Sequence, residues 1–170
     1  ARTLNVSEDT YFEIITSKTA SLLAASCAAG AHSGGASPED TERLRLFGEK
    51  LGIAFQIKDD LFDYDVKNVG KPTGNDIKEK KLTLPLIYTL NNIEKATRRK
   101  LIYIIKNNHN EKDKVQYVLD AVSSAGGIDY TQQKMQDYKT EALHILQHFA
   151  GSPVRAGLEN LVHYVTDRTY

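Results

Sequence analysis

The stretch Gly52–Asp63, with the sequence GIAFQIKDDLFD, combines apolar residues at helical spacing with a group of aspartates. Its polar positions include Gln56, Asp59, Asp60 and Asp63. Because each residue of a helix turns the chain by about 100°, these four share an arc of about 100° on one face. Carboxylates that point into one volume repel one another and raise one another's pKa values unless a cation lies between them. The spacing therefore predicts a divalent metal site, and the alternative is a solvated acidic face.

The helix that carries these aspartates has a clear start. Ser37-Pro38-Glu39-Asp40 places an N-cap residue before a proline at the first helical position, and two acids follow that the helix dipole favours. The aspartates lie near the opposite end, where the dipole disfavours each anion by a few tenths to about 1 kcal/mol. This unfavourable position itself argues for a bound cation.

Helical patterns account for most of the remaining chain. They cover residues 11–32, 38–64, 83–90, 93–106, 112–125 and 128–150, and a last helix starts at Ser152-Pro153. We find no strand alternation, and Gly70, Pro72 and Gly74 argue against helix in the polar loop 65–81. The sequence predicts an all-α fold with about seven helices in a single domain, residues 1–170.

Composition excludes several classes of function. The chain has 22 Lys+Arg and 22 Asp+Glu, so no overall charge favours a nucleic-acid partner or a membrane surface. Cys27 is the only cysteine, which excludes an internal disulfide and suits a reducing compartment. His144 and His148 have the spacing of a zinc pair but no third ligand, so helix packing or a solvated face explains them better. No apolar run approaches the ~20 residues that span a bilayer, and nothing at the start resembles a signal peptide. We expect a soluble, cytoplasmic protein.

Lysines close to the aspartates in sequence, or placed to reach them, suit phosphate groups. Lys18, Lys71 and Lys81 are point charges of the kind that bind phosphate. The alternative for each is an ordinary solvated lysine. For Asp76 the sequence leaves two roles equally open, a water-mediated metal ligand or a cap for the loop.

Motifs in a fixed order extend from Tyr11 to Pro85. The pattern Gly-x-Ala-Phe-Gln-Ile-x-Asp-Asp-x-x-Asp occupies residues 52–63, preceded by Tyr-x-x-Ile-x-x-x-Lys-Thr-Ala at 11–20 and followed by Gly-Lys at 70–71, Gly-x-Asp at 74–76 and Lys-x-Thr-Leu-Pro at 81–85. This set resembles the trans-isoprenyl (polyprenyl) diphosphate synthase family, with its second aspartate-rich motif at 59–63. The ending Tyr164-Val-x-x-Arg168 is similar as well. Lys80 is a departure, since many members have glycine there.

The resemblance implies a fold, a reaction and a set of site residues. The fold would be the C-terminal portion of the isoprenoid-synthase helical bundle, around half of a central cavity. The reaction would condense an allylic diphosphate with isopentenyl diphosphate through Mg²⁺-assisted ionisation, giving an all-trans polyprenyl diphosphate. The implied metal ligands are Asp59, Asp60 and Asp63. The implied diphosphate-binding residues are Lys18, Thr19, Lys71 and Lys81. The implied catalytic residues are Lys18, Gln56 and Asp59.

The chain departs from the family in what it lacks. Family members have a longer chain whose N-terminal half carries the first aspartate-rich motif and the basic residues that hold isopentenyl diphosphate, and neither is found here. The chain also opens at Ala1 without a methionine. We therefore expect a C-terminal portion that is inactive by itself, because the reaction needs metals held by two opposing carboxylate sets. Uncovered apolar faces favour self-association, and a homodimer is expected. The alternative is a naturally short, non-catalytic helical subunit that pairs with or regulates a complete synthase.

Overall fold

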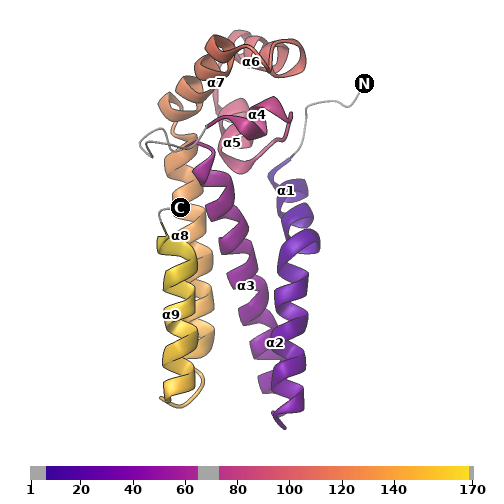
Figure 1. Ribbon diagram of the computed structural model, residues 1–170, viewed down its shortest axis with the longest axis vertical. Helices are drawn as coiled ribbons and strands as arrows, with labels where there is room; N and C mark the ends of the chain where they lie inside the picture. Colours follow the sequence, from indigo (N-terminus) through magenta and orange to yellow (C-terminus); the bar gives the residue numbers. More distant parts are fainter. Residues whose placement is uncertain (1–6, 65–72, 169–170) are drawn as a thin grey trace. The chain divides into compact units, whose positions relative to one another are not determined.

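The computed structural model describes residues 7–64 and 73–168 (Figure 1). The chain divides into two compact units, the first formed by residues 1–11 and 59–132 and the second by residues 12–58 and 133–170. The described residues contain helices and turns but no strand, which confirms the all-α prediction.

The helices follow the predicted segments closely. They are α1 (Glu8–Ile15), the π-helix η1 (Thr16–Ala20), α2 (Ser21–Ser33), α3 (Pro38–Phe62), α4 (Asn75–Lys78), α5 (Leu84–Asn92), α6 (Lys95–Asn107), α7 (Lys112–Ser124), α8 (Gly127–Leu146) and α9 (Pro153–Asp167). Three differences stand out within the described residues. The short helix α4 lies in a loop predicted to be non-helical, and α8 ends at Leu146 instead of near residue 150. The placement of Asp63 on the helical face of Asp59 and Asp60 is also wrong, because α3 ends at Phe62 and Asp63 lies in the turn that follows.

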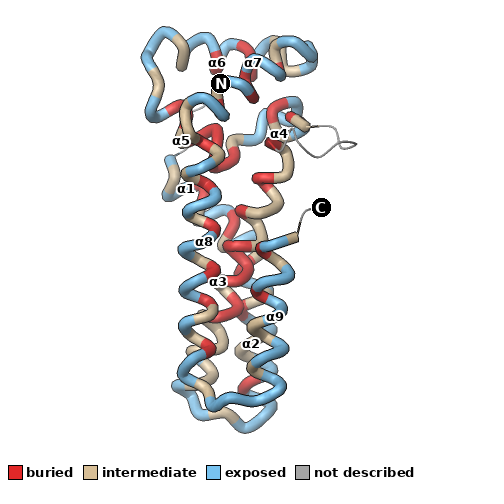
Figure 2. The backbone as a smooth tube through the Cα atoms, turned by 90° about the vertical axis from the view of Figure 1, so that its left-hand side faces the viewer, coloured by how far each residue is buried: buried red, intermediate tan, exposed pale blue. Residues whose placement is uncertain are grey.

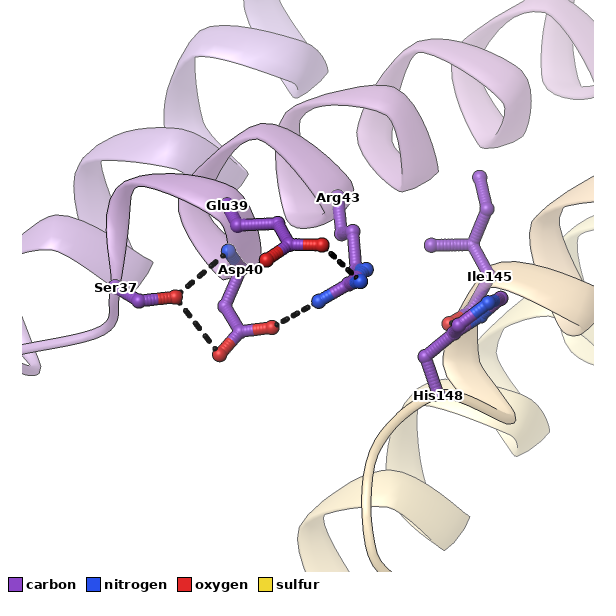
Figure 3. A network of polar contacts seen from close by, with 6 residues as sticks. All are labelled: Ser37, Glu39, Asp40, Arg43, Ile145 and His148. Carbon is purple, nitrogen blue, oxygen red and sulfur yellow. Dashed lines mark hydrogen bonds and ion pairs between the residues drawn. The ribbon is translucent and has the colours of Figure 1, made fainter.

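Both sequence signals of the Ser-Pro type mark true helix starts. At α3 the Ser37 hydroxyl accepts a hydrogen bond from the Asp40 backbone N–H at 3.1 Å. The Asp40 carboxylate in turn accepts from the Arg43 guanidinium at 2.8 Å, and Glu39 also pairs with Arg43 (Figure 3). At α9 the Ser152 hydroxyl accepts from the Arg155 backbone N–H at 3.1 Å. Capping thus fixes the two starts as expected.

The second unit packs α2, α3, α8 and α9 around one apolar core. Its buried residues are Phe47, Leu51, Ala142, Leu146 and Val162. The buried positions of α3 lie mainly in its middle and C-terminal half (Figure 2). At Gly52 the backbones of η1 and α3 approach so closely that a Cβ there would lie 2.6 Å from the Ala20 Cα. Only glycine permits this approach, and it brings the π-helix onto the helix that carries the aspartates.

The first unit has a separate core built mainly from α5, α6 and α7. Its fully buried members include Leu86, Leu101, Ile105, Val118 and Val122. Ile77 of α4 joins this core, so the short helix is held by apolar packing. Gly74, just before α4, has a φ of 78° and lies against Val115, which excludes a side chain at this point.

One helix differs from expectation in its hydropathy. Residues Glu8–Ser33, which comprise α1, η1 and α2, are long and apolar enough to cross a membrane by length and composition alone. The expectation that no apolar run approaches the length of a membrane span is therefore wrong for this helix. Much of the helix's hydropathy comes from alanine, which is less apolar than leucine or isoleucine. Among the described residues it is the single helix of this kind, and the core helix of a soluble protein passes the same test. It is therefore weak support for a membrane span.

Candidate functional site

Asp60, the central aspartate of the cluster, is held by Tyr11. The Tyr11 hydroxyl donates a hydrogen bond to Asp60 Oδ2 at 2.7 Å, and both residues are buried, with exposed fractions of 4% and 8%. Burial and the negative charge of Asp60 raise the pKa of the Tyr11 phenol far above its ordinary value. The phenol therefore stays protonated and remains a donor to the carboxylate at any physiological pH.

Asp63, the last aspartate, anchors the segment that follows the loop. Its Oδ1 accepts from the Asn75 backbone N–H at 2.8 Å and its Oδ2 from the Asp76 N–H at 2.9 Å. Its backbone carbonyl accepts from the Gly74 N–H at 2.9 Å. Both carboxylate oxygens of this predicted metal ligand are thus engaged with the start of α4. They fix the 73–83 segment to the end of α3.

Asp76 lies close to this group as a result. Burial raises the pKa of its carboxyl, the negative charge of Asp63 raises it further, and Lys81 opposes both effects. Lys81 Nζ lies 3.4 Å from Asp76 Oδ1 and 2.6 Å from Glu79 Oε2. The hydrogen bond to Glu79 raises the pKa of the Lys81 ammonium, and the negative charge of Asp76 raises it by a smaller amount. Lys81 therefore stays cationic.

Tyr64, which directly follows Asp63, is a buried phenol that senses the charge of these carboxylates. The side chain is fully enclosed, and its hydroxyl lies 2.7 Å from the Thr83 hydroxyl. Burial is the main reason that the pKa of Tyr64 is raised, and the negative charges of Asp76, Asp63 and Asp60 each raise it further. Three acidic side chains of the first unit therefore act on a single buried phenol.

The second unit holds three further predicted site residues. Lys18 and Thr19 lie in η1, whose π geometry is shown by the Ser21 N–H bonding to the Thr16 carbonyl. The Thr19 hydroxyl donates to Gln56 Oε1 at 3.1 Å, and the side chain of Lys18 is exposed. Single π turns inside α-helices occur frequently at functional sites. The pairing of Thr19 with Gln56 joins two residues that the sequence placed 37 positions apart.

The remaining predictions have mixed outcomes. Lys71 lies outside the described residues. Asp59 is half-buried near the end of α3. In the described part of the chain no group of three His, Cys, Asp or Glu side chains is already arranged to hold a metal ion. His144 and His148 contact each other edge to face, with ring centroids 5.5 Å apart, and both are exposed, which fits the interpretation as a solvated face.

Sequence reasoning missed a polar clamp that positions the start of α1. The Tyr130 hydroxyl contacts both carboxylate oxygens of Glu8, at 2.7 and 2.8 Å, and the Tyr130 ring stacks on Tyr88 with centroids 4.2 Å apart. Glu8 lies one helical turn before Tyr11, so this clamp fixes the turn that presents the donor to Asp60. Nothing local in the sequence reveals it, because Glu8 and Tyr130 are 122 residues apart.

The backbone conformation at Lys80 shows why many members of the family have glycine at this position. Its φ is 57°, in the left-handed region that glycine adopts without cost, and its ammonium donates to the Lys106 carbonyl at 3.0 Å. The backbone here favours glycine, and this chain keeps the turn with a lysine.

Comparison with known proteins identifies relatives along nearly the whole chain. The model of the family described as polyprenyl synthetase matches residues 1–122. A short chain isoprenyl diphosphate synthase from Methanothermobacter thermautotrophicus is 33% identical over 169 residues, which cover 98% of this chain and 51% of that protein. The chain therefore spans about half the length of this relative.

Solved structures are similar in fold. A decaprenyl diphosphate synthase from Rhodobacter capsulatus matches with a TM-score of 0.92 and 32% identity, covering 100% of this chain and 53% of that one. A polyprenyl synthase from Caulobacter crescentus CB15, complexed with calcium and isoprenyl diphosphate, matches with a TM-score of 0.88 and 32% identity, over 98% of this chain and 52% of that one. These likenesses confirm the predicted helical fold.

Proposed function

Because the chain belongs to the polyprenyl synthetase family, we propose that it forms the C-terminal part of a prenyltransferase. The substrates of the parent enzyme would be an allylic diphosphate and isopentenyl diphosphate, and the product an all-trans polyprenyl diphosphate. The observation that carries this proposal is that Asp63 accepts from the backbone N–H groups of Asn75 and Asp76, which brings the carboxylate of Asp76 and its partner Lys81 to the end of α3, where Asp59 and Asp60 lie. Such a concentration of negative charge suits a cation-bridged diphosphate.

The donor chemistry fits Mg²⁺. This ion prefers oxygen ligands, keeps several waters, and needs only one or two carboxylates when substrate phosphates complete its shell. Asp59, Asp60 and Asp63 would hold it, Asp60 oriented by Tyr11 and Asp63 by the backbone of α4. When bound, Mg²⁺ offsets the negative charge of a departing diphosphate. The solved relative from Caulobacter crescentus, complexed with calcium and isoprenyl diphosphate, supports the pairing of a divalent cation with this substrate class.

The basic and polar side chains have separate tasks in this proposal. Lys18, Lys71 and Lys81 would bind the diphosphate oxygens as point charges, and the raised pKa of Lys81 keeps it charged for this role. Thr19 would assist Lys18 from the same π turn. Its hydrogen bond to Gln56 fixes the direction of that amide, which would line the cavity near the reacting carbon. Asp59, Lys18 and Gln56 are thus the proposed catalytic residues.

We further propose that these 170 residues do not turn over substrate by themselves. The first aspartate-rich motif of the family is not found in this sequence, so one of the two opposing carboxylate sets is missing. Exposed apolar side chains on the helix 8–33, Ile14 at 52% and Leu22 at 69%, favour self-association into a homodimer. A cytoplasmic location is part of the same proposal. The alternative function, a short subunit of a complete synthase, predicts a stable mixed complex in size-exclusion chromatography.

Two measurements on the chain test the proposal. Calorimetric titration with inorganic diphosphate should show binding in the presence of Mg²⁺ and at least tenfold weaker binding in EDTA. Asp59→Asn should weaken the Mg²⁺-dependent binding at least tenfold, whereas the matched change Asp137→Asn, at an exposed position of α8, should not alter it. Diphosphate binding that is indifferent to Mg²⁺ and to Asp59 would overturn the site.

The second measurement addresses activity. A continuous assay for diphosphate release, with an allylic and a homoallylic diphosphate as substrates, should show no turnover by the chain. Robust turnover would overturn the proposal that an opposing carboxylate set is required. It would not affect the assignment of the metal and diphosphate residues, which the titration tests separately.

A further inference from the structure

Helix α6 carries a concentration of positive charge that the proposed reaction does not use. It contains Lys95, Arg98, Arg99, Lys100 and Lys106, and no acidic residue. The whole chain, in contrast, has equal numbers of basic and acidic residues. Nearby acids lie outside the helix: Glu94 precedes it, Glu111 accepts from the Asn108 amide, and Asp113 pairs with Lys114 at 3.3 Å. The excess charge is therefore local to α6.

Three of the five cations of α6 lie on the side of the helix that faces away from its core. Leu101, Ile104 and Ile105 are buried, and at 100° per residue the positions 95, 99, 103 and 106 lie within an arc of about 80° on the other side. All four are exposed, and Tyr103 is 62% exposed. This set, Lys95, Arg99, Tyr103 and Lys106, is called the α6 basic face below.

Neighbouring residues extend the α6 basic face without neutralising it. Lys80 donates to the Lys106 carbonyl at 3.0 Å, which adds a cation at the end of the helix. Lys100 lies 4.0 Å from the ring centroid of Tyr117, itself 37% exposed. Among the described residues, no acid pairs with Lys95, Arg99 or Lys106. By comparison, Arg43 and Arg45 of α3 each pair with two carboxylates.

We propose that the α6 basic face, Lys95, Arg99, Tyr103 and Lys106, docks the protein on an anionic lipid surface. Clusters of Lys and Arg are attracted to anionic headgroups, and tyrosine is favoured at the membrane interface. Because the apolar side of α6 is buried in the core, the helix attaches through charge and Tyr103 and does not insert. A nearby bilayer would also receive the apolar prenyl chain of the product, an argument that rests on the proposed function.

Vesicle co-sedimentation of the 170-residue chain tests the docking. Binding to vesicles of phosphatidylcholine with phosphatidylglycerol should exceed binding to pure phosphatidylcholine at least tenfold. Charges are screened beyond ~8 Å at physiological ionic strength. NaCl at 0.5 M, about three times that ionic strength, should therefore abolish the difference. Each cation near an anionic surface contributes about a fivefold change in binding. Lys95→Gln/Arg99→Gln should therefore weaken binding about 25-fold, and Tyr103→Ser should weaken it severalfold.

The matched control is Arg43→Gln/Arg45→Gln, which removes the same net charge from α3, where carboxylates already pair with both arginines. It should leave binding within twofold of wild type. Equal binding to both vesicle types would overturn the proposal and indicate insertion of an apolar helix such as 8–33. Failure to bind anionic vesicles while polyglutamate still binds the chain would overturn it in favour of an acidic protein partner. These outcomes do not depend on Mg²⁺ or diphosphate, so they are separate from the test of the proposed function.

Discussion

Tyr11→Phe is the substitution that examines the carboxylate group most specifically. It removes one oxygen atom and leaves the ring in place, so no cavity of side-chain size forms. The lost bond is the 2.7 Å hydrogen bond from the Tyr11 hydroxyl to Asp60 Oδ2. Because Asp60 is only 8% exposed, water cannot readily replace the donor. Hydrogen bonds to charged groups contribute about 1.5–3 kcal/mol, and we expect the free energy of unfolding to fall by this amount.

Urea and thermal denaturation followed by circular dichroism measure this loss. In a chain of this size each 1 kcal/mol shifts the midpoint by about 2–4 °C, so Tyr11→Phe should lower Tm by about 3–12 °C. Tyr164→Phe is the matched control, since Tyr164 is 74% exposed and should change stability by less than about 0.5 kcal/mol. A double-mutant cycle with Asp60→Ala should give a coupling of about 1–3 kcal/mol. Equal stability of the two phenylalanine variants, or zero coupling, would refute the reasoning.

The remaining predictions concern the loop and the C-terminal helix. Lys80→Gly should stabilise the protein by about 1 kcal/mol in urea denaturation, because glycine adopts the φ of 57° without strain; destabilisation would show that the lysine contact to Lys106 matters more. Asp63→Ala should increase amide hydrogen exchange at Asn75 and Asp76 at least tenfold, because it removes both acceptors; unchanged protection would contradict the anchoring role. Lys139 lowers the pKa of Asp167, so wild type should lose a small, partly screened component of stability as the pH falls through and below about 4. Asp167→Asn should lack that component, and identical pH profiles would exclude it.

The helices could be predicted because their signals are local. Ser37-Pro38 and Ser152-Pro153 specify caps within a few residues, and α3 and α9 begin at Pro38 and Pro153 as predicted. The helical spacing of Asp59 and Asp60 similarly placed them in the last turn of α3, whereas Asp63 lies just past the helix end at Phe62. These features depend on hydrogen bonds and periodicity within one helix, which the sequence displays directly.

The site details could not be predicted because they depend on distant contacts. The π turn at Lys18 coincides with the close approach of Ala20 to Gly52, a tertiary contact. Helix α4 starts on the carboxylate of Asp63, 12 residues upstream of Asn75. The Tyr11 partner of Asp60 lies 49 residues away. Each of these contacts forms only once the chain has folded. The motif therefore indicates the chemistry of the site, but it does not reveal the residues that position it.

The most direct test of the central claim is to locate the cation on the chain. Amide signals of the ¹⁵N-labelled protein are followed by NMR while Mn²⁺ and inorganic diphosphate are added. We predict that paramagnetic broadening begins at residues 59–64 and 73–83, which contain Asp59, Asp60, Asp63, Asp76 and Lys81. Broadening that begins instead at another acidic segment, such as residues 39–42 at the start of α3, would contradict the claim that the end of α3 is the metal and diphosphate site.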